Sequence, residues 1–312
     1  QRHNLNITGG TERVKYFISA GLFDQLATYK LPELNQDIGF DPNPRYTRYN
    51  LRSNFDIQVS EDLTASVRLG GYYSKKNNAN NTNPNENNPN SAVLDYWLRQ
   101  PPMTGIGVYE GKLISGYRND PLSGYDMARG FSIYEEIYSG GFRERIDNNF
   151  TLNLGLNYDL EDITEGLKAR GRVAYTQFYS YEVRRNKNVD SYSFVYDENG
   201  DHFLIQTGFD SDFGSSENYG KRRRYYMEGG IEYDREFGNH AITGLILYNQ
   251  SKEHNPGFQY NVPRAYMGLV GRITYNYKYR YMAEFNLGYN GSENFAKGKR
   301  FRRLNSIQVS ID

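Results

Sequence analysis

The sequence contains no cysteine, only one tryptophan and no excess of charge of either sign. Without thiols it has neither disulfides nor thiolate metal ligands, so cysteine gives no information on its compartment. No run of about 18 apolar residues occurs, which excludes a transmembrane helix. The first residues also lack the basic start and apolar stretch of a signal peptide. These absences leave a membrane protein built from strands possible.

The balance of charges and the aromatic content narrow the class of protein. Lys+Arg 37 matches Asp+Glu 37, which argues against a nucleic-acid-binding protein, because such proteins normally carry a basic excess. The hydrophobic fraction is only 38% and the mean hydropathy is −0.81, yet 15% of the residues are aromatic. A barrel with a wet lumen needs apolar residues on one face only, with aromatic belts at both membrane interfaces. The composition favours such a barrel.

Strict alternation of apolar and polar residues is the main pattern in the chain. From Tyr49 to Val59 the odd positions are nearly all apolar, whereas the even positions from Asn50 to Ser60 are all polar. Alternation of this kind sends successive side chains to opposite faces of a strand. It predicts about ten strands, several of them longer than the roughly 9–11 residues that cross a bilayer. Their ranges are 4–8, 14–23, 49–59, 63–73, 146–160, 167–175, 223–237, 241–250, 265–277 and 281–291.

Short and long connections alternate along the chain. Short turns are expected near 9–12, 60–62, 161–166, 236–239 and 277–280, and long polar connections at about 24–45, 75–145, 185–222 and 251–263. Outer-membrane barrels have short turns on one side and long extracellular loops on the other. The fold class predicted is therefore all-β, an antiparallel transmembrane β-barrel.

The connection 75–145 offers weak candidates for ligand contact. It begins with an asparagine-rich tract, Asn77 to Asn90, that cannot order itself by burying apolar surface. It then becomes richer in structure-forming residues, so part of it is expected to fold over the barrel mouth. Its aromatic residues Tyr96, Trp97 and Tyr109 suit ligand stacking, although packing within the loop is the more ordinary explanation.

Other motifs favour structural explanations over chemistry. The four histidines are scattered and no catalytic motif occurs, so no enzyme, cofactor or metal site is predicted. Asp197, Asn199 and Asp201 fit a hairpin turn better than a calcium loop. Lys221 to Arg224 are expected at a solvated or lipid-phosphate-contacting rim rather than on nucleic acid. Tyrosines near strand ends are expected to form interfacial girdles, with sugar stacking as the alternative; they are Tyr72, Tyr73, Tyr179, Tyr181, Tyr225, Tyr226, Tyr275, Tyr277, Tyr279 and Tyr281.

Several segments resemble a known family in its own order along the chain. Residues 267–301, MGLVGRITYNYKYRYMAEFNLGYNGSENFAKGKRF, closely resemble a hairpin of SusC/RagA-type TonB-linked outer-membrane proteins, also called TonB-dependent receptors. Residues 4–30, NLNITGGTERVKYFISAGLFDQLATYK, are similar to the first barrel hairpin after that family's plug domain. Residues 46–73 and 149–175 resemble later hairpins. The resemblance thus covers the chain to about Phe301, whereas residues 302–312 form an atypical tail that suggests truncation or frame disruption.

The resemblance implies a function for the full-length protein. It implies an importer in the outer membrane of a Gram-negative, Bacteroidetes-like bacterium, taking up a large nutrient such as an oligosaccharide or a peptide. The implied partners are a SusD-like surface lipoprotein, outer-membrane lipid, and TonB acting through a plug domain that these residues do not include. Because transporters of this family close with about 22 strands, the resemblance implies that these strands form part of a larger barrel. As an isolated fragment the chain is expected to be non-functional. The rival interpretations are a passive porin-like or small structural barrel, and a soluble carbohydrate-binding β-protein.

Overall fold

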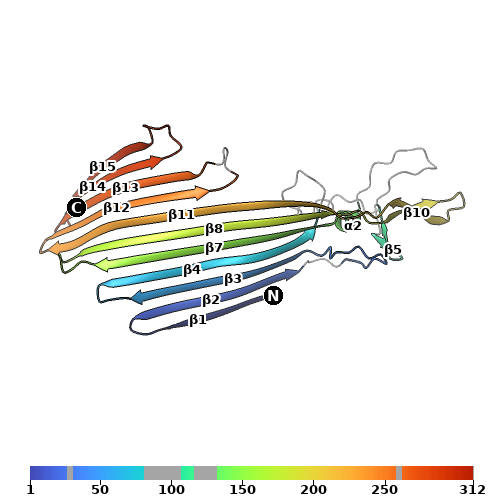
Figure 1. Cartoon of the computed structure of the whole chain (residues 1–312), viewed down its shortest axis with the longest axis horizontal. Coiled ribbons are helices and arrows are strands. Elements are labelled where there is room, and N and C mark those ends of the chain that lie inside the picture. Colours follow the sequence, from blue (N-terminus) through green and yellow to red (C-terminus); the bar gives the residue numbers. More distant parts are fainter. Residues whose placement is uncertain (27–30, 81–106, 116–131, 258–261, 312) are drawn as a thin grey trace.

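The main element of the fold is one large antiparallel sheet. A computed structural model describes residues 1–26, 31–80, 107–115, 132–257 and 262–311. In it, eleven strands follow one another in chain order across an open sheet, with β1 and β15 at the two edges (Figure 1). They are β1 (Arg2–Gly10), β2 (Val14–Leu26), β3 (Arg45–Gln58), β4 (Leu63–Ala79), β7 (Phe142–Asp159), β8 (Leu167–Asn186), β11 (Gly214–Phe237), β12 (His240–His254), β13 (Arg264–Tyr277), β14 (Tyr281–Ser292) and β15 (Phe301–Ile311).

The strand register separates apolar and polar side chains into two faces, as the alternation predicts. Leu154 of β7 lies between Val67 of β4 and Val173 of β8, which gives an apolar face. Its neighbour Asn153 lies between Arg68 and Ala174 on the opposite, polar face. The apolar face is not covered within the described residues: Leu154 is 42% exposed and Val173 56%. An apolar surface this extensive is not stable in water and fits contact with lipid.

The strands extend further at the long-loop side than the sequence indicates. The predicted bounds of the long polar connection at 185–222 are wrong, because β8 continues to Asn186 and β11 already begins at Gly214. Two further strands, β9 (Ser191–Tyr196) and β10 (His202–Gly208), lie between them. Alternation marks only the part of a strand that crosses the apolar band, which is about 25 Å tall. Beyond it both faces meet water, so backbone pairing continues without the hydropathy signal.

An eleventh strand replaces part of the expected tail. Residues 301–311 pair along β14 as β15. Arg303 lies opposite Tyr289 and Asn305 opposite Leu287, so both occupy positions on the apolar face. Polar residues at those positions break the alternation, which explains why the sequence pattern does not indicate this strand.

A small subdomain lies at the long-loop end of the sheet (Figure 1). It contains a four-stranded sheet in the order β10-β9-β6-β5, with β5 (Val108–Tyr109) and β6 (Lys112–Ile114), together with the helix α2 (Ile133–Tyr138). We call these elements, with residues 31–44 and 187–213, the loop-end subdomain. The buried apolar residues of the described chain lie in it or at its edge, including Ile38, Leu113 and Val189. No helix among the described residues has the length and apolar character to cross a membrane.

Candidate functional site: the polar face and the loop-end subdomain

Ion pairs between neighbouring strands cover the turn-side half of the polar face. Arg170 Nη1 of β8 lies 2.5 Å from Glu232 Oε1 of β11, and Arg172 Nε lies 3.2 Å from Glu228 Oε1. Similar pairs join β3 to β4 and β13 to β14. Such partly exposed pairs contribute only about 0–1 kcal/mol each to stability. Their main consequence is a charged, hydrated surface, which is what the wall of an aqueous lumen requires.

Cations predominate on the loop-side half of the same face. The carboxylate of Glu182, whose side chain is 9% exposed, is shared by the guanidinium groups of Arg143 and Arg184. Lys76 of β4 lies directly opposite Arg145 of β7. The polar face is therefore electrostatically asymmetric along the strands, with balanced charge near the turns and positive charge near the loops.

The tyrosines predicted to form girdles occur on both faces. Most of them, such as Tyr73 and Tyr225, are on the apolar face, where Tyr49 and Tyr73 pack at 6.4 Å and Tyr175 and Tyr225 at 5.1 Å between ring centroids. For Tyr72 and Tyr226 the girdle prediction is wrong, because both lie on the polar face. The guanidinium of Arg48 lies 4.0 Å from the ring centroid of Tyr72, and Arg172 lies 5.2 Å from that of Tyr226.

The loop-end subdomain is held by a short helix and its buried tyrosine. Ser132 caps α2, and its Oγ accepts a hydrogen bond from the Glu135 backbone N–H at 3.4 Å. Tyr138 packs with Ile38, Leu113 and Val189, and its hydroxyl donates to the Pro32 carbonyl. Burial raises the pKa of the Tyr138 phenol to about 12. These contacts join residues 31–44, β6, α2 and the segment before β9 into one unit.

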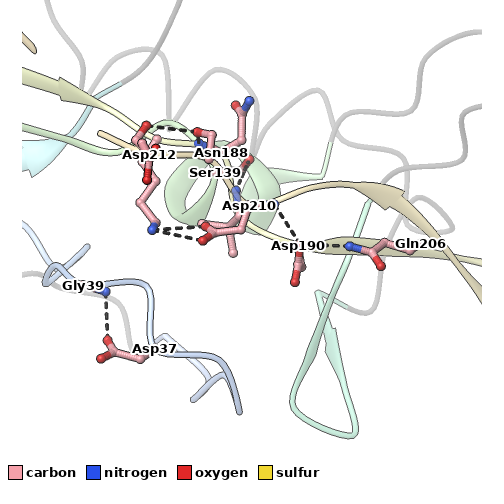
Figure 2. A network of polar contacts seen from close by, with 11 residues as sticks. Asp37, Gly39, Ser139, Asn188, Asp190, Gln206, Asp210 and Asp212 are labelled. Carbon is pink, nitrogen blue, oxygen red and sulfur yellow. Dashed lines mark hydrogen bonds and ion pairs between the residues drawn. The ribbon is translucent and has the colours of Figure 1, made fainter. Parts of the chain in front are cut away.

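A network of polar contacts fixes the segments on either side of the β9–β10 hairpin (Figure 2). Asp190 Oδ1 accepts hydrogen bonds from the Asp210 backbone N–H at 2.8 Å and from Gln206 Nε2 at 2.9 Å. The Lys187 ammonium lies 3.1 Å from Asp210. The Asn188 backbone N–H donates to Ser211 Oγ at 2.9 Å. Because these bonds tie the segment between β8 and β9 to the segment between β10 and β11, the hairpin is held in a fixed position beyond β8 and β11.

Three phenylalanines from distant parts of the chain pack at the base of the subdomain. Phe40, Phe142 and Phe213 have ring centroids 5.7–6.3 Å apart, and the Lys187 ammonium lies 5.0 Å from the centroid of Phe213. These three residues come together only in the tertiary structure, so the alternation of apolar and polar residues could not identify them as a cluster. The signal that could have indicated them is the presence of phenylalanines within connections that are otherwise polar.

Tyr109 is the one candidate for ligand contact that lies in the described chain. It lies in β5 at the edge of the small sheet, with ring centroids 5.2 Å from Phe194 and 6.1 Å from His202. Tyr96 and Trp97 lie outside the described residues. The structure thus brings Tyr109 together with Phe194 and His202, and its contact with a ligand stays a prediction.

Two further motifs have clear positions. Asp197 begins the turn between β9 and β10, where its Oδ1 accepts from the backbone N–H groups of Asn199 and Asp201 at 2.9 Å. The hairpin prediction is therefore confirmed. Lys221 to Arg224 lie within β11 rather than at its start, so their side chains alternate between the faces. Arg222 on the polar face lies 2.9 Å from Glu253.

The residues of the site that sequence analysis did not identify are mainly charged. Arg143 and Arg184 form a group around the buried carboxylate of Glu182, but each of the three lies where the apolar alternation has already ended. Within the described residues, no group of His, Cys, Asp and Glu side chains is arranged to hold a metal ion.

Comparison with known proteins agrees with this geometry. No family model matches the chain. A TonB-dependent receptor of Formosa agariphila is 23% identical over 98% of this chain, and the match covers 27% of that receptor, so the chain spans about a quarter of its length. The structure of the RagAB peptide transporter matches all of the chain and 34% of the transporter chain, with 14% identity and a TM-score of 0.64. The open-open state of the RagAB peptide importer matches with a TM-score of 0.58 and 15% identity.

The TM-scores show a shared fold, and the receptor match extends over nearly the whole chain. An antiparallel sheet with one apolar and one polar face agrees with the structural matches and with the receptor match, although the sheet is not closed. The resemblance drawn from the sequence is thus confirmed: the chain is similar over nearly its whole length to a TonB-dependent receptor, and it shares the fold of the RagAB peptide transporter.

Proposed function

We propose that the complete protein imports a large nutrient across the outer membrane of a Gram-negative, Bacteroidetes-like bacterium, and that these residues form part of its barrel wall and mouth. The observation that carries this proposal is a largely polar face across eleven strands, interrupted by Leu245, Leu247 and Val270 and opposed by an exposed apolar face. One face suits lipid and the other an aqueous lumen. The solute would be an oligosaccharide or a peptide, and these residues alone would not transport it.

In this proposal, the energy for transport and the partner proteins are supplied by parts other than these residues. A plug domain would couple the barrel to TonB, and a SusD-like lipoprotein would cover the mouth. The loop-end subdomain supports the second point, because its hydrogen-bonded hairpin and helix offer a fixed surface at the long-loop end. No covalent chemistry on the solute is proposed.

The transport proposal is tested by uptake in the source bacterium. Cells carrying the full-length gene are compared with a deletion strain for growth on, and uptake of, fluorescent oligosaccharides and peptides. We expect uptake to require both this gene and TonB. Uptake that persists without TonB would instead identify a passive porin. Recovery of the full-length protein in the aqueous fraction after lysis would favour a soluble carbohydrate-binding protein.

The lipoprotein partner requires a separate experiment. The full-length protein, purified in mild detergent through an affinity tag, is analysed for co-purifying lipoproteins. A version lacking 187–213 provides the comparison, because this deletion removes the β9–β10 hairpin and keeps the strands that cross the apolar band. We expect a surface lipoprotein with the complete protein and less of it with the deletion. Equal recovery would mean that this hairpin is not part of the contact.

A further inference from the structure

The polar face contains a hollow of about 370 Å³ near the centre of β3 and β4. This volume falls within the roughly 300–1,000 Å³ of small-ligand sites. The side chains at its rim come from β2, β3, β4 and β7 and are Ser19, Asn50, Arg52, Asn54, Thr151 and Asn153. Gly70 forms part of the floor, and a Cβ there would meet only the Leu51 carbonyl oxygen, at 4.0 Å. The absence of a side chain at Gly70 therefore keeps this part of the floor open.

Arg52 is the distinctive side chain of this hollow. Its cross-strand neighbours are Ser19 on β2 and Gly70 on β4, which are both small. Arg52 is exposed, and no carboxylate of the described chain forms an ion pair with it. The neighbouring Arg68 differs, because its Nη2 lies 3.0 Å from Asp56. A guanidinium presents a planar set of donors that fits a carboxylate or sulfate, so Arg52 is available to an anionic group from outside the chain.

The other rim groups favour a hydroxyl-rich ligand. The amides of Asn50, Asn54 and Asn153 and the hydroxyls of Ser19 and Thr151 each donate and accept hydrogen bonds. Sugar hydroxyls have the same double capacity. The side chains of Leu51 and Leu69 alternate to the apolar face, so an apolar peptide side chain would meet a polar rim. This combination suits an acidic sugar better than an acidic peptide.

The charge around the hollow also favours an anion. On the loop-side half of the polar face, cations come from several strands: Arg48 of β3, Lys76 of β4, Arg145 of β7 and Arg222 and Arg224 of β11. The carboxylates on the same half of the described strands are Asp147, Glu182 and Glu253, which pair with Arg145, Arg143 and Arg222, so the other cations of this half are in excess. A positive field over a polar wall concentrates anions near it.

We infer that the hollow over Gly70 is a binding site for an acidic sugar residue of the transported oligosaccharide, with Arg52 holding its carboxylate or sulfate. This inference rests on the proposed function, because it requires the polar face to line a solute path. The asparagines at the rim bind the hydroxyl groups of the same sugar. The solute class is thus an anionic oligosaccharide.

The test measures binding to the full-length protein in detergent by calorimetry. The probes are trigalacturonate, a sulfated galactose trisaccharide, neutral maltotriose and triglutamate. We expect one of the two acidic sugars to bind more tightly than maltotriose. Arg52→Gln should then weaken its binding by about tenfold, because hydrogen bonds to charged groups are the strong ones. Gly70→Gln should weaken it similarly by filling the hollow, and Lys15→Gln, which removes a cation nearer the turns of the same face, should not.

Several results would overturn the inference. Tighter binding of maltotriose, or acidic-sugar binding that survives both Arg52→Gln and Gly70→Gln, would show that the hollow holds no acidic sugar. Triglutamate binding with the same dependence on Arg52 would reassign the site to acidic peptides. A loss of thermal stability in Arg52→Gln without a change in binding would show that another part of the protein fills the hollow. TonB-dependent uptake of a neutral solute would leave the proposed function standing while this site fails.

Discussion

Adjacent residues of one strand face different surroundings in this sheet, so equal substitutions should have unequal costs. Leu154 lies among apolar side chains on the face assigned to lipid, and Asn153 lies on the polar face. An arginine at mid-depth on the lipid face costs about 2–4 kcal/mol. We expect Leu154→Arg to destabilise the folded full-length barrel by this amount and Asn153→Arg to have little effect.

The measurement is the free energy of unfolding of each variant in lipid vesicles, from denaturant titration. Asn153→Arg serves as the control for the added charge, because it differs from the test variant by one position. Equal losses at both positions would contradict the assignment of the apolar face to lipid.

Burial should likewise distinguish two ion pairs of similar chemistry. The Glu182 side chain is 9% exposed between two arginines, whereas Glu284 and its partner Arg272 are 26% and 51% exposed. Removing one partner of a buried pair costs about 3–5 kcal/mol, and exposed pairs contribute about 0–1 kcal/mol. Glu182→Gln should therefore lower the thermal unfolding temperature of the full-length protein clearly more than Glu284→Gln. A similar decrease of the unfolding temperature in both variants would show that burial of Glu182 does not make its ion pairs more stabilising than an exposed pair.

The sequence predicts single residues well only where one physical requirement dominates. Leu154 and Asn153 are assigned correctly to opposite faces because the apolar band imposes a period of two. Tyr72 is assigned incorrectly, because a tyrosine near a strand end fits both an interfacial girdle and a cation–π contact with Arg48. Arg52 could be placed on the polar face, but the small neighbours Ser19 and Gly70 that make its hollow depend on strand register.

At the scale of elements, two glycines with similar backbone angles should respond differently to substitution. Gly141 before β7 has φ +80 and a Cβ there would lie 1.9 Å from the Arg185 carbonyl oxygen, whereas Gly200 has φ +85 and open space. Both lose about 1–2 kcal/mol as alanine from the left-handed conformation alone. Gly141→Ala should cost more, because the start of β7 and the end of β8 must separate. Hydrogen exchange of β7 and β8 amides in the full-length protein measures this, and equal exchange in the two variants would contradict it.

The buried phenol of Tyr138 should make the loop-end subdomain sensitive to alkaline pH. Its pKa is raised from 10.0 to about 12. Because the folded pKa exceeds the unfolded one, the stabilisation is complete below pH 10 and is lost as the pH rises from 10.0 toward about 12. Tyr138→Phe lacks the ionisation and also the hydrogen bond to Pro32, worth about 1 kcal/mol.

Limited proteolysis of the full-length protein between about pH 9 and about pH 11 compares the two proteins. We expect cleavage near α2 to accelerate with pH in the natural protein, relative to a model peptide substrate. In Tyr138→Phe, cleavage should be faster at the lower pH and show no such acceleration. The same pH dependence in both would show that another group controls the subdomain.

Element boundaries are predictable only within the apolar band. The turn sides of β7, β8, β11 and β12 agree with the sequence prediction, because short turns follow directly where alternation ends. The loop sides do not agree, because β11 begins at Gly214 in water-facing surroundings that impose no pattern. The small sheet and α2 are held by contacts between segments far apart, such as Asp190 with Gln206 and Tyr138 with Pro32, which periodicity does not report.

For the whole molecule, the direction and number of strands determine whether these residues can close by themselves. In a chain-ordered antiparallel sheet of eleven strands, the edge strands β1 and β15 run in the same direction. Closure would thus need a parallel contact, whereas bacterial single-chain barrels have an even number of antiparallel strands. Unpaired backbone groups at open edges cost several kcal/mol each in lipid. We therefore expect the refolded 312-residue chain to give no heat-modifiable band in detergent gels, and the full-length protein to give one. A heat-modifiable, protease-resistant band from the 312-residue chain would show that the eleven strands close alone, and the lumen would then belong to a small barrel rather than to a large transporter.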